Sequence, residues 1–217
     1  MFQRLLPLFK EEGIKKLSNS TVAVVGVGGV GGIAAITLAR TGVGNIIIQD
    51  FDTVEESNIN RQIVANYSTI GLSKVDVLEK QIKEINPNCN VIKLNSFFDK
   101  DNLSLFSYNI DYVIDAIDSF ESKCLLINNC IERNIQFISS MGAAKKLDPT
   151  KISITRLQKT TYDPLAKKLR SYFKNKNFFV VSSTEESKCE ELGSYMPVVS
   201  IFGIYTAHHV INKIVGE

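Results

Sequence analysis

The stretch that decides the fold is residues 22–61, VAVVGVGGVGGIAAITLARTGVGNIIIQDFDTVEESNINR. It opens with four apolar residues, 22–25, a pattern typical of a short buried strand. Residues 33–40 carry a helical pattern. Between strand and helix lie three glycines with G-x-G-x-x-G spacing: Gly26, Gly28 and Gly31. The stretch therefore predicts a strand, a tight turn and a helix.

The glycine turn predicts a nucleotide site. Glycine permits the tight turn and a close approach of backbone to phosphate, and the helix N-terminus offers free N–H groups. A second apolar strand, residues 46–48, ends in Asp50 and Asp52. Asp50 follows Gly26 by 24 residues, where an acid can bind ribose hydroxyls. This context favours nucleotide binding over a purely structural glycine turn.

Size and composition indicate one globular α/β domain. The chain has 217 residues, is 44% apolar and carries a formal net charge of +2. Such a chain can bury a full core. We expect no apolar run of transmembrane length, no signal peptide and no membrane partner, which makes the cytoplasm the expected location.

The four cysteines contain no C-x-x-C pair, so we expect no structural zinc. Cys124 and Cys130 lie on one predicted helix and are interpreted as packing residues. Cys89 carries no site signal. Cys189 lies in a glutamate-rich segment, which disfavours a catalytic thiolate, and its role stays open.

Alternating strands and helices predict a Rossmann-like, doubly wound, mostly parallel sheet with helices on both faces. Helices are expected at residues 3–17, 33–40, 74–85 and 122–133, and strands at 22–25, 46–48, 91–94, 111–117 and 136–139. After Gly142 the rhythm breaks into strands at 152–157 and 178–182 and helices at 164–173 and 198–214. We expect residues 1–142 to form the nucleotide-binding core and residues 143–217 an extension of antiparallel strands and helices, for substrate binding and dimerisation, within one domain.

Acidic residues end two predicted strands beside the glycine turn. They are Asp50 and Asp52 after one strand, and Asp115 and Asp118 at the end of another. Ligands bind beyond the carboxyl ends of parallel strands, where these acids would repel phosphates unless Mg²⁺ intervenes. Asp118 is the better Mg²⁺ ligand because it lies just past its strand, although it could instead cap the next helix.

Three further side chains suit a phosphate site. Lys74 falls in the first turn of a helix, where the dipole disfavours a cation unless phosphate lies nearby. Asn58 and Arg61 follow the second strand and could join Lys74 near the glycine turn. A solvated surface lysine is the alternative for Lys74.

These motifs closely resemble the ThiF/MoeB-type adenylyltransferases related to ubiquitin-activating enzymes. The resemblance rests on GVGGVG at 26–31, DFDTV at 50–54, SNINRQ at 57–62, GLSK at 71–74 and DAIDS at 115–119. It implies an ATP-dependent enzyme, usually a homodimer, that activates a carboxylate as an acyl-adenylate and releases pyrophosphate. It also implies that Lys74 binds phosphate, that Asp118 holds Mg²⁺ and that Arg4 reaches the partner subunit's site.

Together, the motifs and the resemblance predict a set of site residues. The expected catalytic residues are Arg4, Arg61, Lys74 and Asp118. The expected nucleotide contacts are Gly26, Gly28, Gly29, Gly31, Asp50, Asp52, Ser57, Asn58, Arg61, Lys74, Asp115, Asp118 and Ser119.

Residues 157–170 and 193–203 resemble the tRNA threonylcarbamoyladenosine dehydratase branch of the family, although the segment at 174–190 is shorter than is typical there. That branch implies adenylation of the threonyl carboxylate of the modified adenosine, followed by intramolecular cyclisation with net loss of water. One alternative is adenylation of the C-terminal glycine of a ubiquitin-like sulfur carrier, with a sulfur-transfer or small carrier protein as partner. A more distant alternative is an NAD-dependent oxidoreductase.

A basic block supports RNA as the substrate. From Lys145 to Lys176 there are ten lysines and arginines against two aspartates, the kind of patch that binds a phosphate backbone. The expected tRNA contacts are Lys145, Lys146, Lys159, Lys167, Lys168 and Arg170, and the alternative is a solvated basic face. Tyr162, Tyr172 and Phe173 could stack bases, although core packing is favoured for Phe173. His208 and His209 are interpreted as structural or surface residues.

Overall fold

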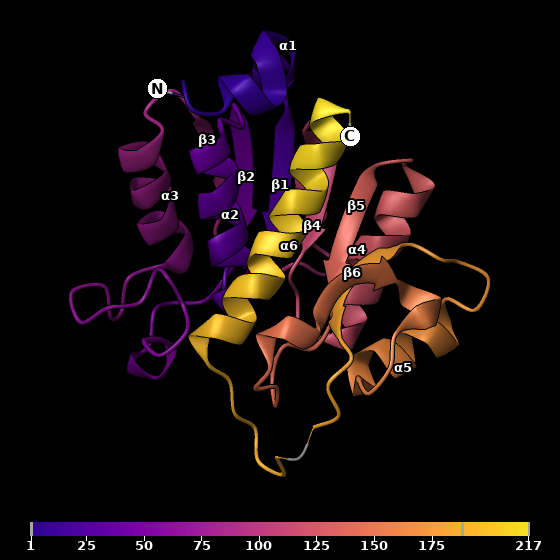
Figure 1. Cartoon of the computed structure of the whole chain (residues 1–217). Helices are drawn as coiled ribbons and strands as arrows, with labels where there is room; N and C mark the ends of the chain where they lie inside the picture. The colour runs from indigo at the N-terminus through magenta and orange to yellow at the C-terminus, as the bar shows by residue number, and fades with distance from the viewer. Residues whose placement is uncertain (1, 188, 217) are drawn as a thin grey trace.

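The computed structural model describes residues 2–187 and 189–216. One seven-stranded sheet crosses the molecule in the order β3-β2-β1-β4-β5-β7-β6 (Figure 1). Its strands are β1 (Thr21–Val25), β2 (Asn45–Gln49), β3 (Asn90–Leu94), β4 (Tyr112–Asp115), β5 (Gln136–Ser140), β6 (Ile152–Arg156) and β7 (Phe179–Ser183). All neighbouring strands run parallel except β6, which pairs antiparallel with β7. The predicted doubly wound sheet is confirmed, and only one strand of the extension is antiparallel.

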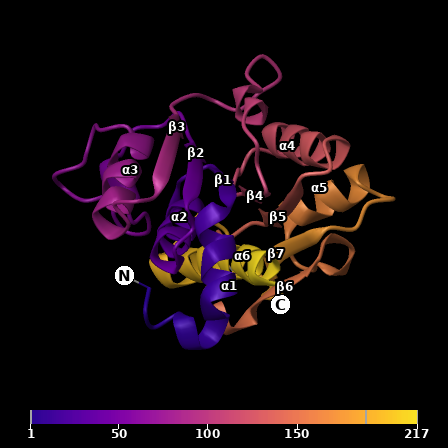
Figure 2. The same ribbon diagram turned by 90° about the horizontal axis from the view of Figure 1, so that it is seen from above.

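Helices cover both faces of this sheet (Figure 2). They are α1 (Leu6–Asn19), α2 (Gly29–Thr41), α3 (Lys74–Ile85), α4 (Phe120–Glu132), α5 (Pro164–Tyr172) and α6 (Met196–Val215), with 3₁₀ turns at Glu56–Asn58, Ser104–Ser107, Pro149–Lys151 and Leu157–Lys159. Core residues of α2, α3 and α6 form one cluster with β1 and β2, whereas α4 packs on the other face with β4 and α5. Strand β7 and helix α6 thus extend the core begun by residues 1–142.

Helix α6 is the one described helix long and apolar enough to cross a membrane, contrary to the expectation that no apolar run reaches that length. One side of it, including Val198, Phe202 and Val210, is buried. Gly203 lies so close to α2 that a Cβ there would approach the carbonyl oxygen of Val30 to 2.4 Å. These contacts are those of a core helix.

Helix α1 begins at Leu6, later than predicted, and is kinked at Lys10, whose φ is +57°. It ends directly before β1, so it lies at the amino ends of the strands (Figure 1). The exposed Arg4 precedes it. Arg4 is therefore at the opposite end of the sheet from the carboxyl ends of β1, β2 and β4.

Candidate functional site

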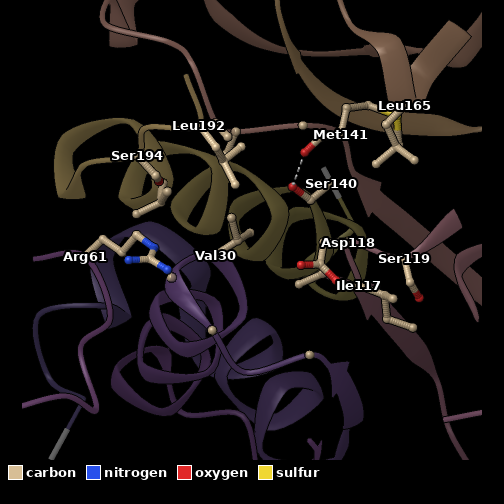
Figure 3. A pocket seen from close by; sticks show the side chains of 18 of the residues that line it. Val30, Arg61, Ile117, Asp118, Ser119, Ser140, Met141, Leu165, Leu192 and Ser194 are labelled. Carbon is tan, nitrogen blue, oxygen red and sulfur yellow. Dashed lines mark hydrogen bonds between the residues drawn. The ribbon is translucent and has the colours of Figure 1, made fainter. Parts of the chain in front are cut away.

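A cleft of about 1440 Å³ lies beyond the carboxyl ends of the strands. We call one side of the cleft the first wall; it consists of the turns after β1, β2 and β4, the segment 58–62 and Lys74. We call the other side the second wall; its lining residues come from three segments, 140–146, 162–170 and 186–194. Figure 3 shows Arg61 and Asp118 with Val30 between them, and Leu192, Met141 and Leu165 along the other side. Both parts of the sequence singled out as functional thus meet at one cleft.

The three motif glycines have different physical roles. Gly26 has a φ of +83°, and a Cβ there would lie 2.7 Å from the carbonyl oxygen of Ala116. Gly28 lines the cleft, and a Cβ there would meet nothing nearer than the Gln62 amide at 3.7 Å. Gly31 does not line the cleft; a Cβ there would lie 1.8 Å from the oxygen of Gly26. Gly31 is therefore required for packing, which corrects its expected role as a nucleotide contact.

Asp50 joins the first two turns of the cleft. Its Oδ2 accepts a hydrogen bond from the Val27 amide at 2.7 Å, and its Oδ1 accepts one from the Asp52 amide at 2.9 Å. Gly29, the first residue of α2, lines the cleft beside this junction. The carboxylate at the end of β2 therefore fixes the loop that precedes the helix N-terminus.

Lys74 is compensated within the protein. Its side chain is only 7% exposed, and its Nζ lies 2.7 Å from Asp52 Oδ2. Both residues line the cleft. The unfavourable position of a cation at a helix N-terminus is thus offset by Asp52, so it does not by itself require a bound phosphate.

Arg61 is held by the 3₁₀ turn that precedes it. Its Nη1 donates to the Ser57 carbonyl at 2.8 Å and to Asn60 Oδ1 at 2.9 Å. The buried Asn58 accepts from the Glu55 amide at 3.2 Å, which closes the turn. Asn58 and Arg61 line the cleft, whereas the Ser57 side chain is exposed outside it. Ser57 contributes its carbonyl to the position of Arg61, and its contact with nucleotide stays a prediction.

Asp115, at the end of β4, and Asp118, in the turn after it, were both predicted to contact the nucleotide, but their surroundings differ. Asp118 is exposed and lines the cleft together with Ser119. No hydrogen bond to the Asp118 carboxylate is found in the described part of the chain, so it does not cap α4. Asp115 is fully buried, and its Oδ2 accepts from Lys123 Nζ at 2.8 Å and from Ser139 Oγ at 2.5 Å. Asp115 is therefore not available to a nucleotide, which corrects that expectation.

Sequence reasoning missed Lys123. It is fully buried, and besides Asp115 its ammonium contacts Ser139 Oγ at 3.2 Å and the Ser140 carbonyl at 3.0 Å. Asp115 Oδ1 in turn accepts from the Ile117 amide at 3.1 Å. The network joins β4, β5, α4 and the turn that carries Asp118. The sequence does contain a signal for this network, because Lys123 lies at helical spacing from Ile127 and Cys130, on the apolar face of the helix.

The second wall receives only part of the basic block. Lys145, Lys146, Lys167 and Arg170 line the cleft, but Lys159 and Lys168 do not. Lys146 is 5% exposed, and its ammonium donates to the carbonyls of Tyr162, at 3.1 Å, and Glu185. Arg170 donates to the Thr160 carbonyl at 2.8 Å. Lys146 and Arg170 therefore hold segments of this wall together, and a contact of either cation with phosphate stays a prediction.

The buried cysteines and the histidines are not activated. Burial raises the pKa of Cys124 to about 11 and that of Cys130 to about 12, as packing residues require. None of the described cysteines lines the cleft, and Cys189 is exposed. Burial, followed by Lys213, lowers the pKa of His209 to about 4. Its ring packs on Phe179 at 4.6 Å on a surface away from the cleft.

The donor set fits magnesium held partly by a phosphate ligand. Within residues 2–187 and 189–216, no group of three His, Cys, Asp or Glu side chains is arranged to hold a metal alone. Mg²⁺ commonly takes only one or two carboxylates and completes its shell with phosphates and water. Asp118, exposed at the cleft, matches that requirement.

A glycine turn, a strand-end acid and clustered phosphate-type cations at the carboxyl edge of a parallel sheet define a nucleotide-binding protein of the Rossmann class. The ThiF family model matches residues 2–217, and the chain belongs to the ThiF family.

Relatives of known name lie within that family. The chain is 48% identical over 162 residues to the tRNA threonylcarbamoyladenosine dehydratase of Bacillus subtilis, covering 74% of this chain and 64% of that protein. It is 42% identical over 179 residues to the Escherichia coli enzyme of that name, covering 82% of this chain and 66% of that protein. These alignments span slightly less than two thirds of either relative. The crystal structure of the E. coli enzyme in complex with ATP superposes with a TM-score of 0.94 at 38% identity, covering 98% of this chain and 93% of that chain.

Proposed function

We propose that the chain uses ATP to adenylate the threonyl carboxylate of N6-threonylcarbamoyladenosine in tRNA, which then cyclises. The observation that carries this proposal is the shared cleft, in which a phosphate-type wall with Lys74, Arg61 and Asp118 faces a second wall with Lys145 and Lys167. The similarity to enzymes of that name from two bacteria supports the choice of substrate.

The first wall would bind and orient ATP. Next to Gly28, the backbone N–H groups at the start of α2 can donate hydrogen bonds to phosphate oxygens. The Asp50 carboxylate can accept hydrogen bonds from the ribose hydroxyls. Lys74 and Arg61 would stabilise the negative charge that develops on the phosphates, a preorganised electrostatic contribution. Release of Lys74 from Asp52 would leave that carboxylate free to face the metal.

Asp118 would hold Mg²⁺ together with the phosphates. When bound, the metal neutralises phosphate charge. We assign this role to Asp118 because its carboxylate is exposed at the cleft, whereas the Asp115 carboxylate is buried in an ion pair with Lys123.

The chemistry needs no nucleophile from the protein. A carboxylate oxygen of the substrate attacks the α-phosphorus of ATP, the bond between the α- and β-phosphates breaks, and pyrophosphate leaves. The carbamoyl group of the same substrate then attacks the activated carbonyl, and AMP leaves with the former carboxylate oxygen. The second step is intramolecular, so the substrate already holds its attacking group. A cleft without a described cysteine suits this route better than transfer through a thioester.

Adenylation of a sulfur-carrier protein tail remains the second candidate. The first wall would bind ATP in the same way, but a protein tail would not need the phosphate-binding cations of the second wall. An NAD-dependent oxidoreductase leaves Lys74, Arg61 and Asp118 without a role.

We further infer that the enzyme acts as a homodimer. Arg4 directly precedes α1, which lies at the amino ends of the strands, at the opposite end of the sheet from the cleft of the same chain (Figure 1). This position is consistent with a role of Arg4 at the cleft of another copy. Mixing an inactive Arg4→Ala chain with an inactive Asp118→Ala chain should restore part of the activity, and an active monomer in light scattering would contradict this inference.

The test of the function is ATP–pyrophosphate exchange with three acceptors: tRNA carrying the modification, tRNA lacking it, and a ubiquitin-like sulfur carrier. Exchange that depends on the modified tRNA supports the proposal. Exchange that requires the carrier protein instead would establish the second candidate. Calorimetry should show binding of Mg-ATP well above that of NAD.

A further inference from the structure

Three aromatic side chains of the basic block differ in what they contact. Phe173 is buried. Tyr172 packs edge-on against Phe120 and Phe173, at centroid distances of 6.1 and 4.7 Å, and its hydroxyl accepts from Asn128 Nδ2 at 3.1 Å. Tyr162 is 57% exposed, lines the cleft and has no ring partner among the described residues. Of these three rings, only Tyr162 is available to a ligand in the cleft.

The backbone of Tyr162 is held in an unfavourable conformation. Its φ is +50°, in the left-handed region that side chains other than glycine seldom adopt. Lys146 donates to its carbonyl at 3.1 Å and also to the carbonyl of Glu185. The Glu185 carboxylate accepts from the amides of Leu147 and Asp148, both at 2.9 Å. Three loops are thus tied together around one exposed tyrosine.

Both parts of this arrangement cost free energy. The strained φ is unfavourable for a tyrosine, and Lys146 is almost fully buried with carbonyls as its hydrogen-bond partners. A tyrosine that merely covered the surface would need neither. The strained backbone of Tyr162 and the buried charge of Lys146 occur together beside an exposed ring. This combination indicates that the ring is held in place to contact a ligand.

The surroundings of Tyr162 identify the chemistry of that ligand. Lys145 and Lys167 line the same wall and would attract phosphates, while Met141 and Leu165 add apolar surface (Figure 3). Cations that follow a backbone, together with an aromatic ring on which a base stacks, are the usual elements of single-stranded nucleic acid binding. Unstacked bases of single-stranded RNA loops are commonly bound by stacking on aromatic side chains.

We propose that Tyr162 is the stacking platform for the target base of the RNA. The proposal rests on the proposed function, because it assigns the base-binding contact of the same cleft.

The test compares tRNA affinity, its salt dependence and thermal stability across four variants of the full chain. Tyr162→Ala should weaken binding of modified tRNA by about 10- to 100-fold, the range of one lost base stack, without changing the slope of log affinity against log salt, because no phosphate contact is lost. Tyr162→Phe should retain wild-type affinity. Tyr172→Ala, at the equally exposed tyrosine outside the cleft, should bind as wild type. Tyr162→Gly should weaken binding like Tyr162→Ala and should melt at a higher temperature than Tyr162→Ala, since both variants lack the ring and only glycine relieves the positive φ.

The outcomes separate this proposal from the proposed function. If wild type binds tRNA but Tyr162→Ala binds equally well, or if Tyr172→Ala is equally impaired, the stacking role is wrong even when pyrophosphate exchange succeeds. If exchange fails with modified tRNA but the Tyr162 variants lose RNA affinity as expected, the base platform stands and the reaction must be reassigned. Mg-ATP affinity, measured by calorimetry, should be unchanged in all four variants.

Discussion

The two walls of the cleft fix their charged groups in different ways. On the first wall, short bonds within neighbouring turns place each group, as Asp50 does with Val27 and Asp52 with Lys74. On the second wall, three segments distant in sequence meet, and the cations Lys146 and Arg170 are used to hold them together. The sequence motifs therefore predicted which residues of the first wall lie at one cleft, whereas a count of charges did not show that Lys146 and Arg170 also hold the segments of the second wall together.

The largest expected loss of activity comes from a change in the first wall. Asp118→Asn removes a carboxylate that would hold Mg²⁺, a contribution of several kcal/mol, so turnover should fall on the order of 10³-fold or more. The fold should persist because the side chain is exposed. The measurement is pyrophosphate exchange, with the exposed Asp101→Asn as the control. Near-normal exchange by Asp118→Asn would show that the metal is held elsewhere.

The next effect lies at the joint between the walls. Lys123→Met leaves the Asp115 carboxylate buried without its cation, so we expect a loss of about 3–5 kcal/mol in the free energy of unfolding. Urea denaturation measures it. The double variant Lys123→Met with Asp115→Leu should recover part of that stability, because it removes both charges. A loss below about 1 kcal/mol in the single variant would mean that the network does not join the two walls.

Arg61→Ala tests the electrostatic role of the first wall. Removal of one preorganised charge stabiliser should lower the rate of adenylate formation by about 10²–10³-fold in single-turnover measurements. Arg40→Ala, in the last turn of α2 and outside the cleft, is the control. An unchanged rate in Arg61→Ala would leave Lys74 as the only cation of this wall that acts on the phosphates.

A smaller effect sharpens the second wall. Lys167 and Lys168 are adjacent exposed residues on α5, but only Lys167 lines the cleft. Lys167→Gln should reduce the slope of log tRNA affinity against log salt by about 0.7–0.9, the value for one phosphate contact, while Lys168→Gln should leave it unchanged. Equal slopes in both variants would indicate a diffuse basic face.

The smallest effect lies outside both walls. His209 has a folded-state pKa near 4 against an ordinary value of 6.5, so it resists protonation in the folded state. Its stabilisation is complete above pH 6.5 and is lost as the pH falls towards 4, where the unfolded state gains the proton first. Allowing for its partial exposure, we expect about 1 kcal/mol. His209→Gln should reduce the change in melting temperature between pH 7 and pH 4 relative to wild type.

Much of the fold could be predicted because local patterns were unambiguous. The apolar runs ending at Val25 and Ile48 and the glycine turn placed β1, α2 and β2 within a few residues of their observed bounds. The phosphate cluster followed from the same logic, since the carboxyl ends of parallel strands must meet. The position of β7 beside β5 did not follow, because strand order depends on pairing between segments distant in the chain.

The sequence by itself determined the class of fold, the glycine turn and the residues Asp50, Lys74, Arg61 and Asp118 at one edge. Only the tertiary structure decided which of two similar side chains can contact a ligand and which is held by other residues of the protein. Asp115 is buried with Lys123 while Asp118 is exposed, and Tyr172 is packed while Tyr162 faces the cleft. The physical reason is that a motif fixes the order of side chains along the chain, whereas burial and partnership depend on segments that the motif does not contain.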